Sequence, residues 1–599
     1  MTTGAEAGGS EVVSPDALGA GIGHVPASWD LEADVVIIGA GASGLPAAIK
    51  AADAGVSVIV VEANYDVGGH AILSGGNVPL GGGTSAQRKY GIADSPDTVF
   101  TDLTDWSIVQ PNGWPDYRYN DRAVMRAFAD HCAETYEFLV ANGVKFKEIP
   151  PDNVGAHSTG NSAPRENHAF WTEGAGPASP SGRGGAGLVR PLEASARAKG
   201  VKFLLNYKMT NLIRTTASDA AFSRVIGVTA TYSPRILPGT TTPLQSYRST
   251  GNINSTQPRV SIRAAKAVIL ATGGSTSNVN FRRMFDPRLT EVYQVGGEPY
   301  TFQDGSGELA AMAIGASLWG LGNQMLENGA TTRTQRAIGT RYNYFVWDVD
   351  CPFFPLVRAT GLEVQNWQDL ILVNQLGQRF YDETKGDYAH GNASNELTPY
   401  TPNDYRNNAR ITYDPTKYNF FNAAAAMNAA SEPPDYSAGP IWAIFDADAV
   451  AREQWQVTPP YVDPEGYCFS AETLTALAAA INNPYQAKPM DGATLHATVE
   501  RYNAFVKAGT DVDFGKPTPL YKIQTPPFYA AWATPLVHDT RAGLRINARC
   551  QVVDMQGQVI PGLYCGGESA GGFNQHGLGR CTAQGYIAGK YAAAERPNP

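Results

Sequence analysis

Charged residues are sparse in this sequence, and no long run of either sign occurs. Lys, Arg, Asp and Glu make up 17% of the 599 residues, and the formal net charge is -10. Nucleic acids and anionic membranes attract proteins through concentrated positive charge, which is missing here. We therefore expect no nucleic-acid partner and predict that the protein acts on a small molecule.

Long apolar runs and paired cysteines are missing too. No stretch approaches the roughly 18 apolar residues of a transmembrane helix, and the Gly-rich N-terminal arm lacks a signal-peptide pattern. We expect a cytoplasmic protein without a membrane span. The six cysteines form no C-x-x-C pair, so an iron-sulfur cluster or a c-type haem has no evident ligand set. We predict no metal site and an external electron donor or acceptor.

Residues 34–62 contain the first strong motif, DVVIIGAGASGLPAAIKAADAGVSVIVVE. Their pattern predicts strand, helix and strand at residues 35–38, 45–54 and 56–61. Gly39 permits a tight turn, Gly41 lets the backbone approach a pyrophosphate, and Gly44 lets the helix pack on the strand. Glu62 ends the second strand, where a carboxylate accepts ribose hydroxyls. These features together predict a dinucleotide-binding unit, which serves NAD and FAD alike.

Later segments decide between the two cofactors. They read GGHAILSGGNVPLGGG at Gly68–Gly83, RVIGVTATYS at Arg224–Ser233, KAVILATGG at Lys266–Gly274 and VIPGLYCGGE at Val559–Glu568. They resemble the FAD-binding domain of the flavoprotein family that includes the succinate dehydrogenase flavoprotein, flavocytochrome fumarate reductases and 3-ketosteroid dehydrogenases. The resemblance implies that the cofactor is FAD.

The resemblance extends over most of residues 34–593. Further matching stretches lie at Asp304–Ala316, Leu372–Glu383, Pro440–Ala449, Leu495–Lys516 and Pro526–Ala530. It implies an α/β fold with a Rossmann-like FAD-binding domain and an inserted α+β cap. The expected divisions are a flexible arm at 1–30, the two parts of the FAD-binding domain at 31–325 and 537–599, and the cap at 326–536.

The same signatures imply which residues contact FAD. These residues are Gly39, Gly41, Ser43, Gly44, Glu62, Ala63, Gly69, His70, Ser74, Gly75, Gly76, Ala271, Thr272, Gly273, Asp304, Gly567, Glu568, Gly579 and Arg580. His70 stands where succinate enzymes attach FAD covalently, but the gap to Gly75 is one residue shorter than in those enzymes. We expect non-covalent FAD, with a covalent link through His70 as the alternative.

A cap loop supplies the first candidates for acid–base chemistry. Fumarate and succinate enzymes place a proton-donor arginine four residues after the glutamate that corresponds to Glu383, and this chain has none there. Ketosteroid dehydrogenases have a tyrosine near that position, and Tyr388 is one residue away from it. A tyrosine whose pKa of about 10 is lowered locally can exchange the substrate proton. We predict Tyr388 as the acid or base, with Lys385 and Asp387 as reserves.

Two C-terminal segments supply candidate substrate contacts. His538, in VHDTRAGLRIN, resembles the family histidine that binds a substrate oxygen, and Arg541 lies in the same turn. In GGFNQHGLGRC, at residues 571–581, His576 is a further candidate contact. The glycines and Arg580 are expected to serve the flavin, next to a helix predicted over 582–594.

Departures from the dicarboxylate enzymes narrow the predicted reaction. Glu327 stands where those enzymes have a histidine, and Gly577 stands where they have an arginine that clamps a carboxylate. We predict hydride transfer between flavin N5 and a carbon–carbon bond beside a carbonyl, in a bulky ketosteroid-like or cyclic enone substrate. The alternatives are a fumarate reductase-like reductase of a small unsaturated acid, an oxidase of an alcohol or amine, and a non-catalytic electron-transfer subunit.

Overall fold

The structure is a computed structural model, and it describes most of the chain. The described residues are 25–104, 121–152, 162–174, 176–180, 184–215, 223–285, 289–319, 330–333, 337–342, 348–380, 382–386, 440–534, 536–540, 542–573 and 577–597. All statements below concern these residues.

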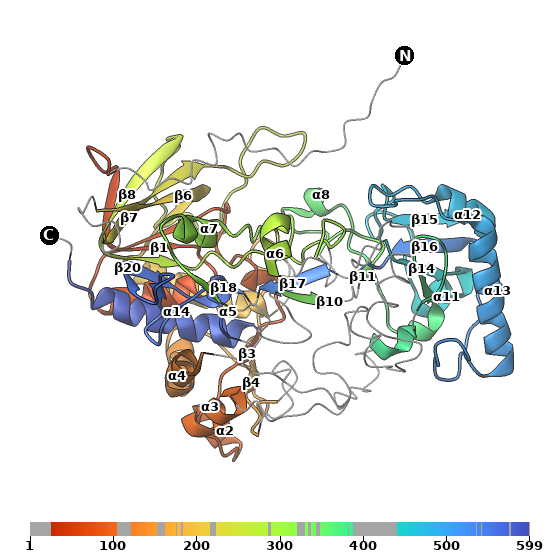
Figure 1. Ribbon diagram of the computed structural model, residues 1–599, viewed down its shortest axis with the longest axis horizontal. Helices are drawn as coiled ribbons and strands as arrows, with labels where there is room; N and C mark the ends of the chain where they lie inside the picture. The colour runs from red at the N-terminus through yellow and green to blue at the C-terminus, as the bar shows by residue number, and fades with distance from the viewer. Residues whose placement is uncertain are drawn as a thin grey trace.

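The largest sheet has eight strands and draws on two distant parts of the chain (Figure 1). Its strands are β1 (Leu31–Ile38), β2 (Val58–Glu62), β5 (Lys202–Leu205), β6 (Tyr207–Arg214), β7 (Val225–Tyr232), β8 (Arg259–Leu270), β19 (Gln551–Val553) and β20 (Val559–Cys565). Strands β20, β8, β1, β2 and β5 lie side by side and run parallel. Strands β6 and β7 extend the sheet in antiparallel pairs from β8, and β19 is antiparallel to β20. The C-terminal part of the chain therefore completes the N-terminal sheet.

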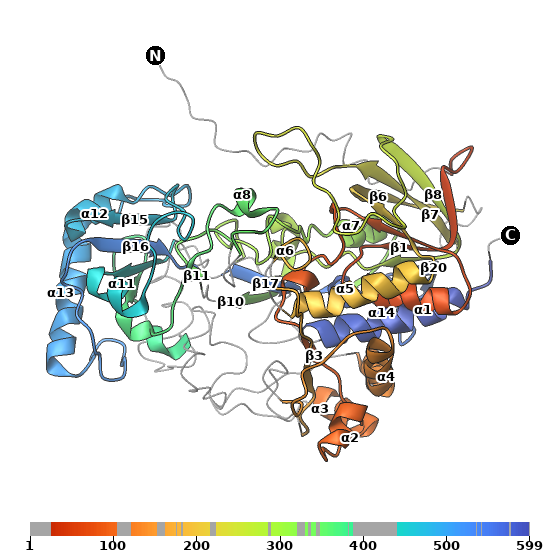
Figure 2. The ribbon, with the colours of Figure 1, turned by 180° about the vertical axis from the view of Figure 1, so that it is seen from behind.

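Helices α1 (Gly44–Asp53), α5 (Gly185–Ala198) and α14 (Leu578–Ala593) lie together on one side of this sheet (Figure 2). Helix α14 packs very closely on α1. A methyl group at Gly585 would lie 2.1 Å from the carbonyl oxygen of Ser43, and one at Gly589 would lie 2.4 Å from that of Ala47. Both distances are shorter than any van der Waals contact, so these two glycines set the spacing of the helices.

A four-stranded antiparallel sheet forms the other end of the molecule in Figure 1. Its order is β13 (Ile371–Val373), β14 (Trp442–Phe445), β16 (Phe528–Trp532) and β15 (Cys468–Ala471). Alternate residues point to opposite faces. Helices α12 (Leu474–Ala480) and α13 (Gly492–Ala508) share a core with one face, and α11 (Ala447–Glu453) shares a core with the other. This is the cap that the sequence predicted.

Further elements lie outside the two sheets. Before the cap they are β3 (Asn77–Pro79), α2 (Ser85–Lys89), α3 (Pro96–Thr104), α4 (Arg122–Ala141), β4 (Glu166–His168), α6 (Val279–Phe285), α7 (Ser306–Ala313) and β9 (Leu318–Trp319). The remainder are β10 (Ala330–Arg333), β11 (Ala337–Ile338), α8 (Phe354–Val357), β12 (Leu362–Glu363), β17 (Leu536–Thr540) and β18 (Gly543–Leu544). Strand β17 pairs with β10, and β18 pairs with β9.

The predicted fold class is confirmed, because an α/β sheet carries an inserted cap. The domain divisions stay as we proposed them. The arm expected at residues 1–30 is anchored at its end, since Asp30 accepts a hydrogen bond from the backbone N–H of Ser261 at 2.7 Å. Among the described helices, none combines the length and apolar character needed to cross a bilayer. The cytoplasmic location remains a prediction.

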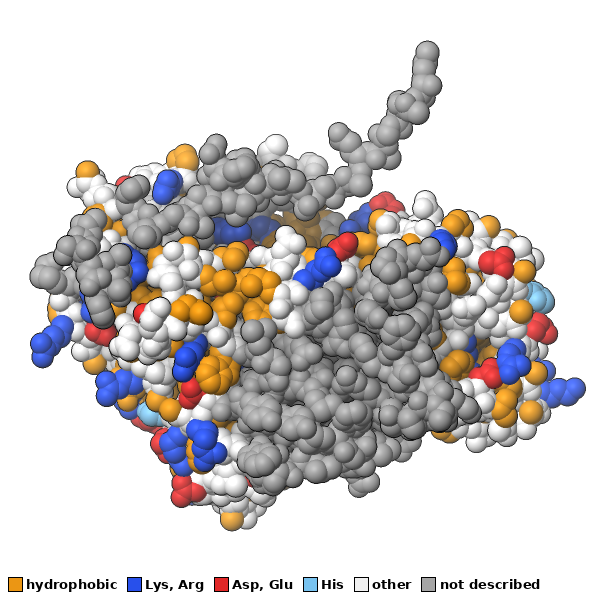
Figure 3. All heavy atoms as spheres, in the orientation of Figure 1, with side chains coloured by type: hydrophobic (Ala, Val, Ile, Leu, Met, Phe, Trp, Pro, Cys, Tyr) orange, Lys and Arg blue, Asp and Glu red, His pale blue; other side chains and the backbone are white. Residues whose placement is uncertain are grey.

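The visible face in Figure 3 carries dispersed acidic and basic side chains. Among the described residues on that face, blue and red atoms are scattered in small groups. This distribution agrees with the low charge content of the sequence.

Candidate functional site: a nucleotide-binding pocket

A cavity of about 790 Å³ opens at the carboxyl ends of four parallel strands. Its walls include the residues that follow β1, β2, β8 and β20, namely Gly39, Ala63, Ala271 and Gly566. In open parallel sheets, this edge is where nucleotide ligands bind. The fold therefore brings four segments that are far apart in the sequence to one binding edge.

The glycine-rich turn between β1 and α1 forms the tightest part of this edge. Gly39 has a φ of +102°, and a methyl group there would lie 2.3 Å from the carbonyl oxygen of Ala271. A methyl group at Gly44 would lie 1.8 Å from the carbonyl oxygen of Gly39. At Gly41 the nearest atom would be 3.7 Å away, and Gly41 lines the cavity. Gly39 and Gly44 are therefore needed for packing, whereas Gly41 leaves the backbone open to a ligand.

Glu62 lies at the end of β2 and is buried. Its carboxylate accepts hydrogen bonds from the backbone N–H groups of Ala40, at 2.7 Å, and Asn64, at 2.8 Å. Burial raises the pKa of Glu62, while these two hydrogen bonds oppose that shift. Glu62 thus joins the turn after β1 to the segment after β2, and it lines the cavity.

A second wall, which the sequence did not reveal, comes from β6, from the residues after β7 and from residues 296–303. Lys208 and Met209 of β6 line the cavity, as do Arg235, Tyr300 and Phe302. Arg235 donates to the carbonyl oxygen of Tyr300 at 3.2 Å. No motif marks these residues. The antiparallel extension of the sheet brings Lys208 and Met209 to the cavity, and Arg235 follows β7 there.

A third wall joins β8, η5 (Gly567–Ser569) and α7. The hydroxyl groups of Thr272 and Ser569 lie 2.8 Å apart, and Thr272 Oγ1 lies 3.4 Å from Glu308 Oε2. Glu308 is fully buried, and its Oε1 atom has no hydrogen-bond partner among the described residues. Burial raises its pKa to about 8, so the carboxyl group is held protonated at neutral pH.

The raised pKa of Glu308 predicts how the stability of the protein changes with pH. Its pKa is raised in the folded protein, so its contribution to stability is complete below about pH 4.5 and is lost as the pH rises through about 8. This pKa shift corresponds to on the order of 5 kcal/mol at most in the free energy of unfolding. Glu308→Gln should remove this part of the pH dependence, so its melting temperature should fall less than that of the wild type between pH 5 and pH 9. Glu500→Gln, on the exposed face of α13, is the matched control. Parallel melting curves for the wild type and Glu308→Gln would contradict the assignment.

Most of the predicted cofactor contacts line the cavity together. They are Gly39, Gly41, Ser43, Glu62, Ala63, Gly69, His70, Ser74, Gly75, Ala271, Thr272, Gly273, Asp304, Gly567 and Glu568. Asp304 pairs with Lys208 at 2.5 Å, and Glu568 accepts a hydrogen bond from Gln303 at 2.5 Å. The side chain of His70 lies against Gly297 on the cavity wall. Whether His70 carries a covalent link stays a prediction.

Four predicted contacts lie outside the lining, each for a packing reason. Gly44 packs on the turn, as described above, and a methyl group at Gly76 would lie 2.5 Å from the backbone of Gly184. One at Gly579 would lie 2.1 Å from the carbonyl oxygen of Pro79. Arg580 is buried and donates to the carbonyl oxygens of Phe573, at 3.0 Å, and Thr540, at 3.2 Å. From the first turn of α14, Leu578 and Cys581 line the cavity instead.

The catalytic candidates fall largely outside what the structure describes. Tyr388, Asp387, His576 and Arg541 lie outside the described residues. Lys385 lies in η4 (Glu383–Gly386) and His538 in β17, but their side chains are not described. The roles of all six residues therefore remain predictions.

The cavity suits a dinucleotide in shape and chemistry. The open backbone at Gly41, the acceptor at Glu62 and the extent of the cavity match a ligand with a pyrophosphate, a ribose and two ring systems. A fold and a site of this kind define a dinucleotide-binding protein.

Comparison with known proteins establishes the family. The FAD binding domain family matches residues 34–580, and the chain belongs to it. A urocanate reductase from Eggerthella lenta is 27% identical over 95% of this chain and 76% of its own length. A 3-oxosteroid 1-dehydrogenase from Mycobacterium tuberculosis is 23% identical over 94% of this chain and 98% of its own length.

The fold has a counterpart among solved structures. The open conformation of a flavocytochrome c3 fumarate reductase superposes with a TM-score of 0.61 at 21% identity, covering 95% of this chain and 79% of that chain. The protein is an FAD-dependent oxidoreductase in a group whose members act on CH–CH bonds, as the sequence predicted.

Proposed function

We propose that the protein oxidises or reduces a carbon–carbon bond next to a carbonyl group, in a bulky substrate without a dicarboxylate character. Bound FAD would supply the donor or acceptor of the hydride. The chain's own residues would hold FAD at Gly41, Glu62 and the wall at β6, and would orient the substrate and exchange its proton.

One observation most strongly supports a substrate that is not a dicarboxylate. By the resemblance, the carboxylate-clamping arginine of fumarate enzymes corresponds to Gly577, and Gly577 lines the cavity. A methyl group there would meet no described atom within 4 Å, which supports the absence of a clamp at this position. Arg580, the nearest arginine in sequence, is buried and committed to two backbone carbonyl oxygens.

The described lysine and arginine side chains that line the cavity, Lys208 and Arg235, are not part of helix α14. Lys208 pairs with Asp304, and Arg235 donates to the backbone of Tyr300. Among the described lining residues, no lysine or arginine comes from α14 or from β3. A carboxylate bound beside those elements would therefore lack a described cationic partner, which disfavours fumarate.

The acid–base roles remain as the sequence predicted them. Tyr388 would exchange the substrate proton, with Lys385 and Asp387 as reserves, and His538 would donate a hydrogen bond to the substrate carbonyl. His576 and Arg541 are the further candidate contacts. Tyr388→Phe should slow the reaction of the bound substrate without releasing FAD.

A single-turnover experiment tests this proposal against its alternatives. The flavin is reduced anaerobically and mixed separately with a steroidal enone, fumarate, urocanate and oxygen, and the return of its visible absorbance is followed. The enone should reoxidise it much faster than either acid does. Rapid reoxidation by fumarate would support the small-acid reductase, reoxidation by oxygen alone would support the oxidase, and no reaction with any organic acceptor would support the carrier.

A further inference from the structure

Strand β4 carries an ionisable pair of side chains at the edge of the cavity. Glu166 and His168 are two residues apart in an extended strand, so they lie on the same face. Arg165 and Asn167, on the other face, bind Asp94 and the carbonyl oxygen of Leu80. Strand β4 pairs with β3 so that His168 is opposite Asn77 and Glu166 is opposite Pro79.

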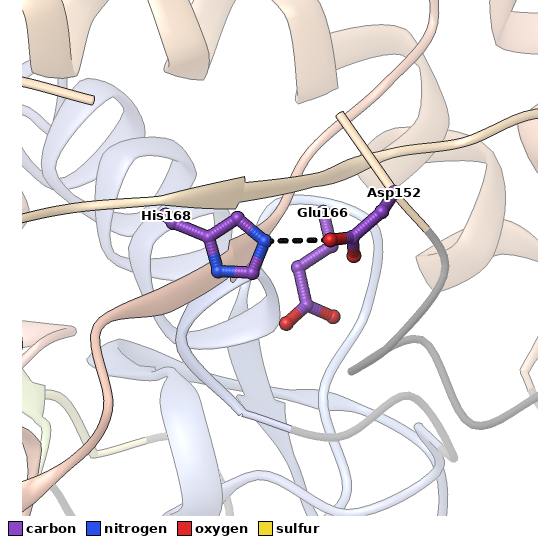
Figure 4. Close-up of side chains that lie close together, drawn as sticks. All are labelled: Asp152, Glu166 and His168. Atoms are coloured by element: carbon purple, nitrogen blue, oxygen red, sulfur yellow. Dashed lines mark hydrogen bonds and ion pairs between the residues drawn. The ribbon is translucent and has the colours of Figure 1, made fainter. Parts of the chain in front are cut away.

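The third member of the cluster is Asp152, whose backbone forms a bridge with Glu166. Its Oδ2 atom lies 2.9 Å from Nε2 of His168 (Figure 4). The other ring nitrogen, Nδ1, lies 3.2 Å from Oδ1 of Asn77. Both ring nitrogens thus face oxygen atoms, which fixes the orientation of the ring.

Exposure changes in steps across the cluster. The side chain of Asp152 is 38% exposed and that of His168 is 16% exposed, whereas Glu166 is fully buried. Glu166 and Asn77 also line the cavity. One ligand-type atom from each of Asp152, Glu166 and His168 lies within 4.8 Å of the other two, a gap that a single water molecule bridges. The cluster therefore reaches from solvent to the inside of the FAD-binding cavity.

We propose that His168 and Glu166 form a proton relay between solvent and this cavity, with Asp152 as a positioning residue. The imidazolium of His168 passes a proton to the Glu166 carboxylate through one bridging water. The protonated Glu166 then releases that proton inside the cavity, and His168 takes another proton from solvent. Each step breaks one N–H or O–H bond and forms another, no electron moves, and both side chains return to their starting charge.

The reaction class explains why such a relay is needed. Reduction of a carbon–carbon double bond consumes a proton for each hydride, and oxidation releases one, inside a cavity that must exclude bulk water. The relay rests on flavin chemistry in this cavity and not on the proposed enone substrate. It would resupply whichever side chain exchanges the substrate proton.

Photoreduction of the bound flavin without any organic substrate tests the relay. FAD-loaded protein in weak buffer with a pH indicator is reduced anaerobically by light with a sacrificial electron donor, and proton uptake, corrected for the protons that the donor releases, is compared with flavin bleaching. Glu166→Gln and His168→Gln should each delay proton uptake by about 10-fold or more relative to bleaching. His496→Gln, a histidine exposed on α13, should leave both signals together. Added imidazole should restore uptake in His168→Gln, whose site reaches solvent, but not in Glu166→Gln.

Bound FAD and melting temperature are measured for every variant, because a relay role predicts little change in either. If His168→Gln loses FAD, Asp152→Asn replaces it, with the expectation of a smaller delay. Proton uptake that keeps pace with bleaching in all these variants would overturn the proposal. So would a delay in His168→Gln that imidazole does not relieve, or a stoichiometric metal ion found at this cluster in the purified protein. Because no enone is present, the proposed substrate can fail while the relay stands.

Discussion

Gly44→Ala should destabilise the protein and abolish FAD binding, whereas Gly41→Ala should weaken FAD binding and leave the apoprotein stable. The new methyl group at residue 44 would lie 1.8 Å from the carbonyl oxygen of Gly39, so strand, turn and helix would have to move apart. We expect a cost of about 3 kcal/mol or more, at the upper end of overpacking effects. The methyl group at residue 41 has no protein atom closer than 3.7 Å, but it enters the cavity.

Comparing Gly44→Ala with Gly41→Ala separates the effect of packing within the turn from the effect of contact with the ligand. For Gly41→Ala we expect a loss of FAD affinity of about 10- to 100-fold, which corresponds to the usual overpacking cost of 1–3 kcal/mol. Thermal melting of the apoproteins and flavin fluorescence titration measure the two effects separately. Unchanged FAD affinity in Gly41→Ala would mean that the ligand does not approach this turn.

Glu383→Gln should destabilise the cap strongly. Glu383 is buried and binds Arg379 through two contacts of 2.8 Å, and Lys516 lies 3.3 Å from its Oε2 atom. Burial alone would raise the pKa of Glu383, but the charges of Arg379 and Lys516 outweigh it and hold the pKa at about 2. Neutralising Glu383 leaves two buried cations with less compensation, at a cost of about 3–5 kcal/mol in the free energy of unfolding.

A double-mutant cycle and a pH series test this network. The double variant Glu383→Gln/Lys516→Met removes one charge of each sign and should be more stable than the sum of the single changes predicts. Because the pKa of Glu383 is depressed in the folded protein, its stabilisation is present above about pH 4.5 and is lost as the pH falls towards 2. Additive losses in the cycle, or equal acid sensitivity of the wild type and Glu383→Gln, would contradict this account.

The sequence predicted the nucleotide unit well because each of its parts has a local cause. The helix expected over 45–54 is α1, and Glu62 ends β2 as predicted. Strand β1 begins at Leu31, four residues earlier than expected. Its first residues, Leu31–Ala33, pair with β8, and the register of this pairing shifts between Ala33 and Val35. That pairing is made with residues more than 200 positions away, so no local pattern could indicate it.

The C-terminal segment was harder to predict because its glycines concealed a helix. Helix α14 begins at Leu578 and not at 582. Leu578 and Cys581 are three residues apart and face the cavity together, which turns Gly579 and Arg580 towards the protein. The spacing of the glycines could have suggested close helix packing, but only the position of α1 decides which face of α14 is covered.

The wall at β6 and the Asp152–Glu166–His168 cluster could not be read from the sequence at all. Lys208 and Met209 sit in an ordinary strand, and the cluster joins residues that only the pairing of β3 with β4 brings to the cavity. The sequence did indicate the cofactor, because FAD recognition depends on residues within short motifs. The missing arginine clamp at Gly577 stays a prediction.

Product analysis of the single-turnover reaction tests the central claim most directly. The anaerobically reduced protein is mixed with a steroidal enone, and the organic product is identified by mass spectrometry. We predict a product that has gained two hydrogens across the carbon–carbon double bond, in an amount equal to the flavin reoxidised. Flavin reoxidised by fumarate with formation of succinate, while the enone returns unchanged, would contradict the account.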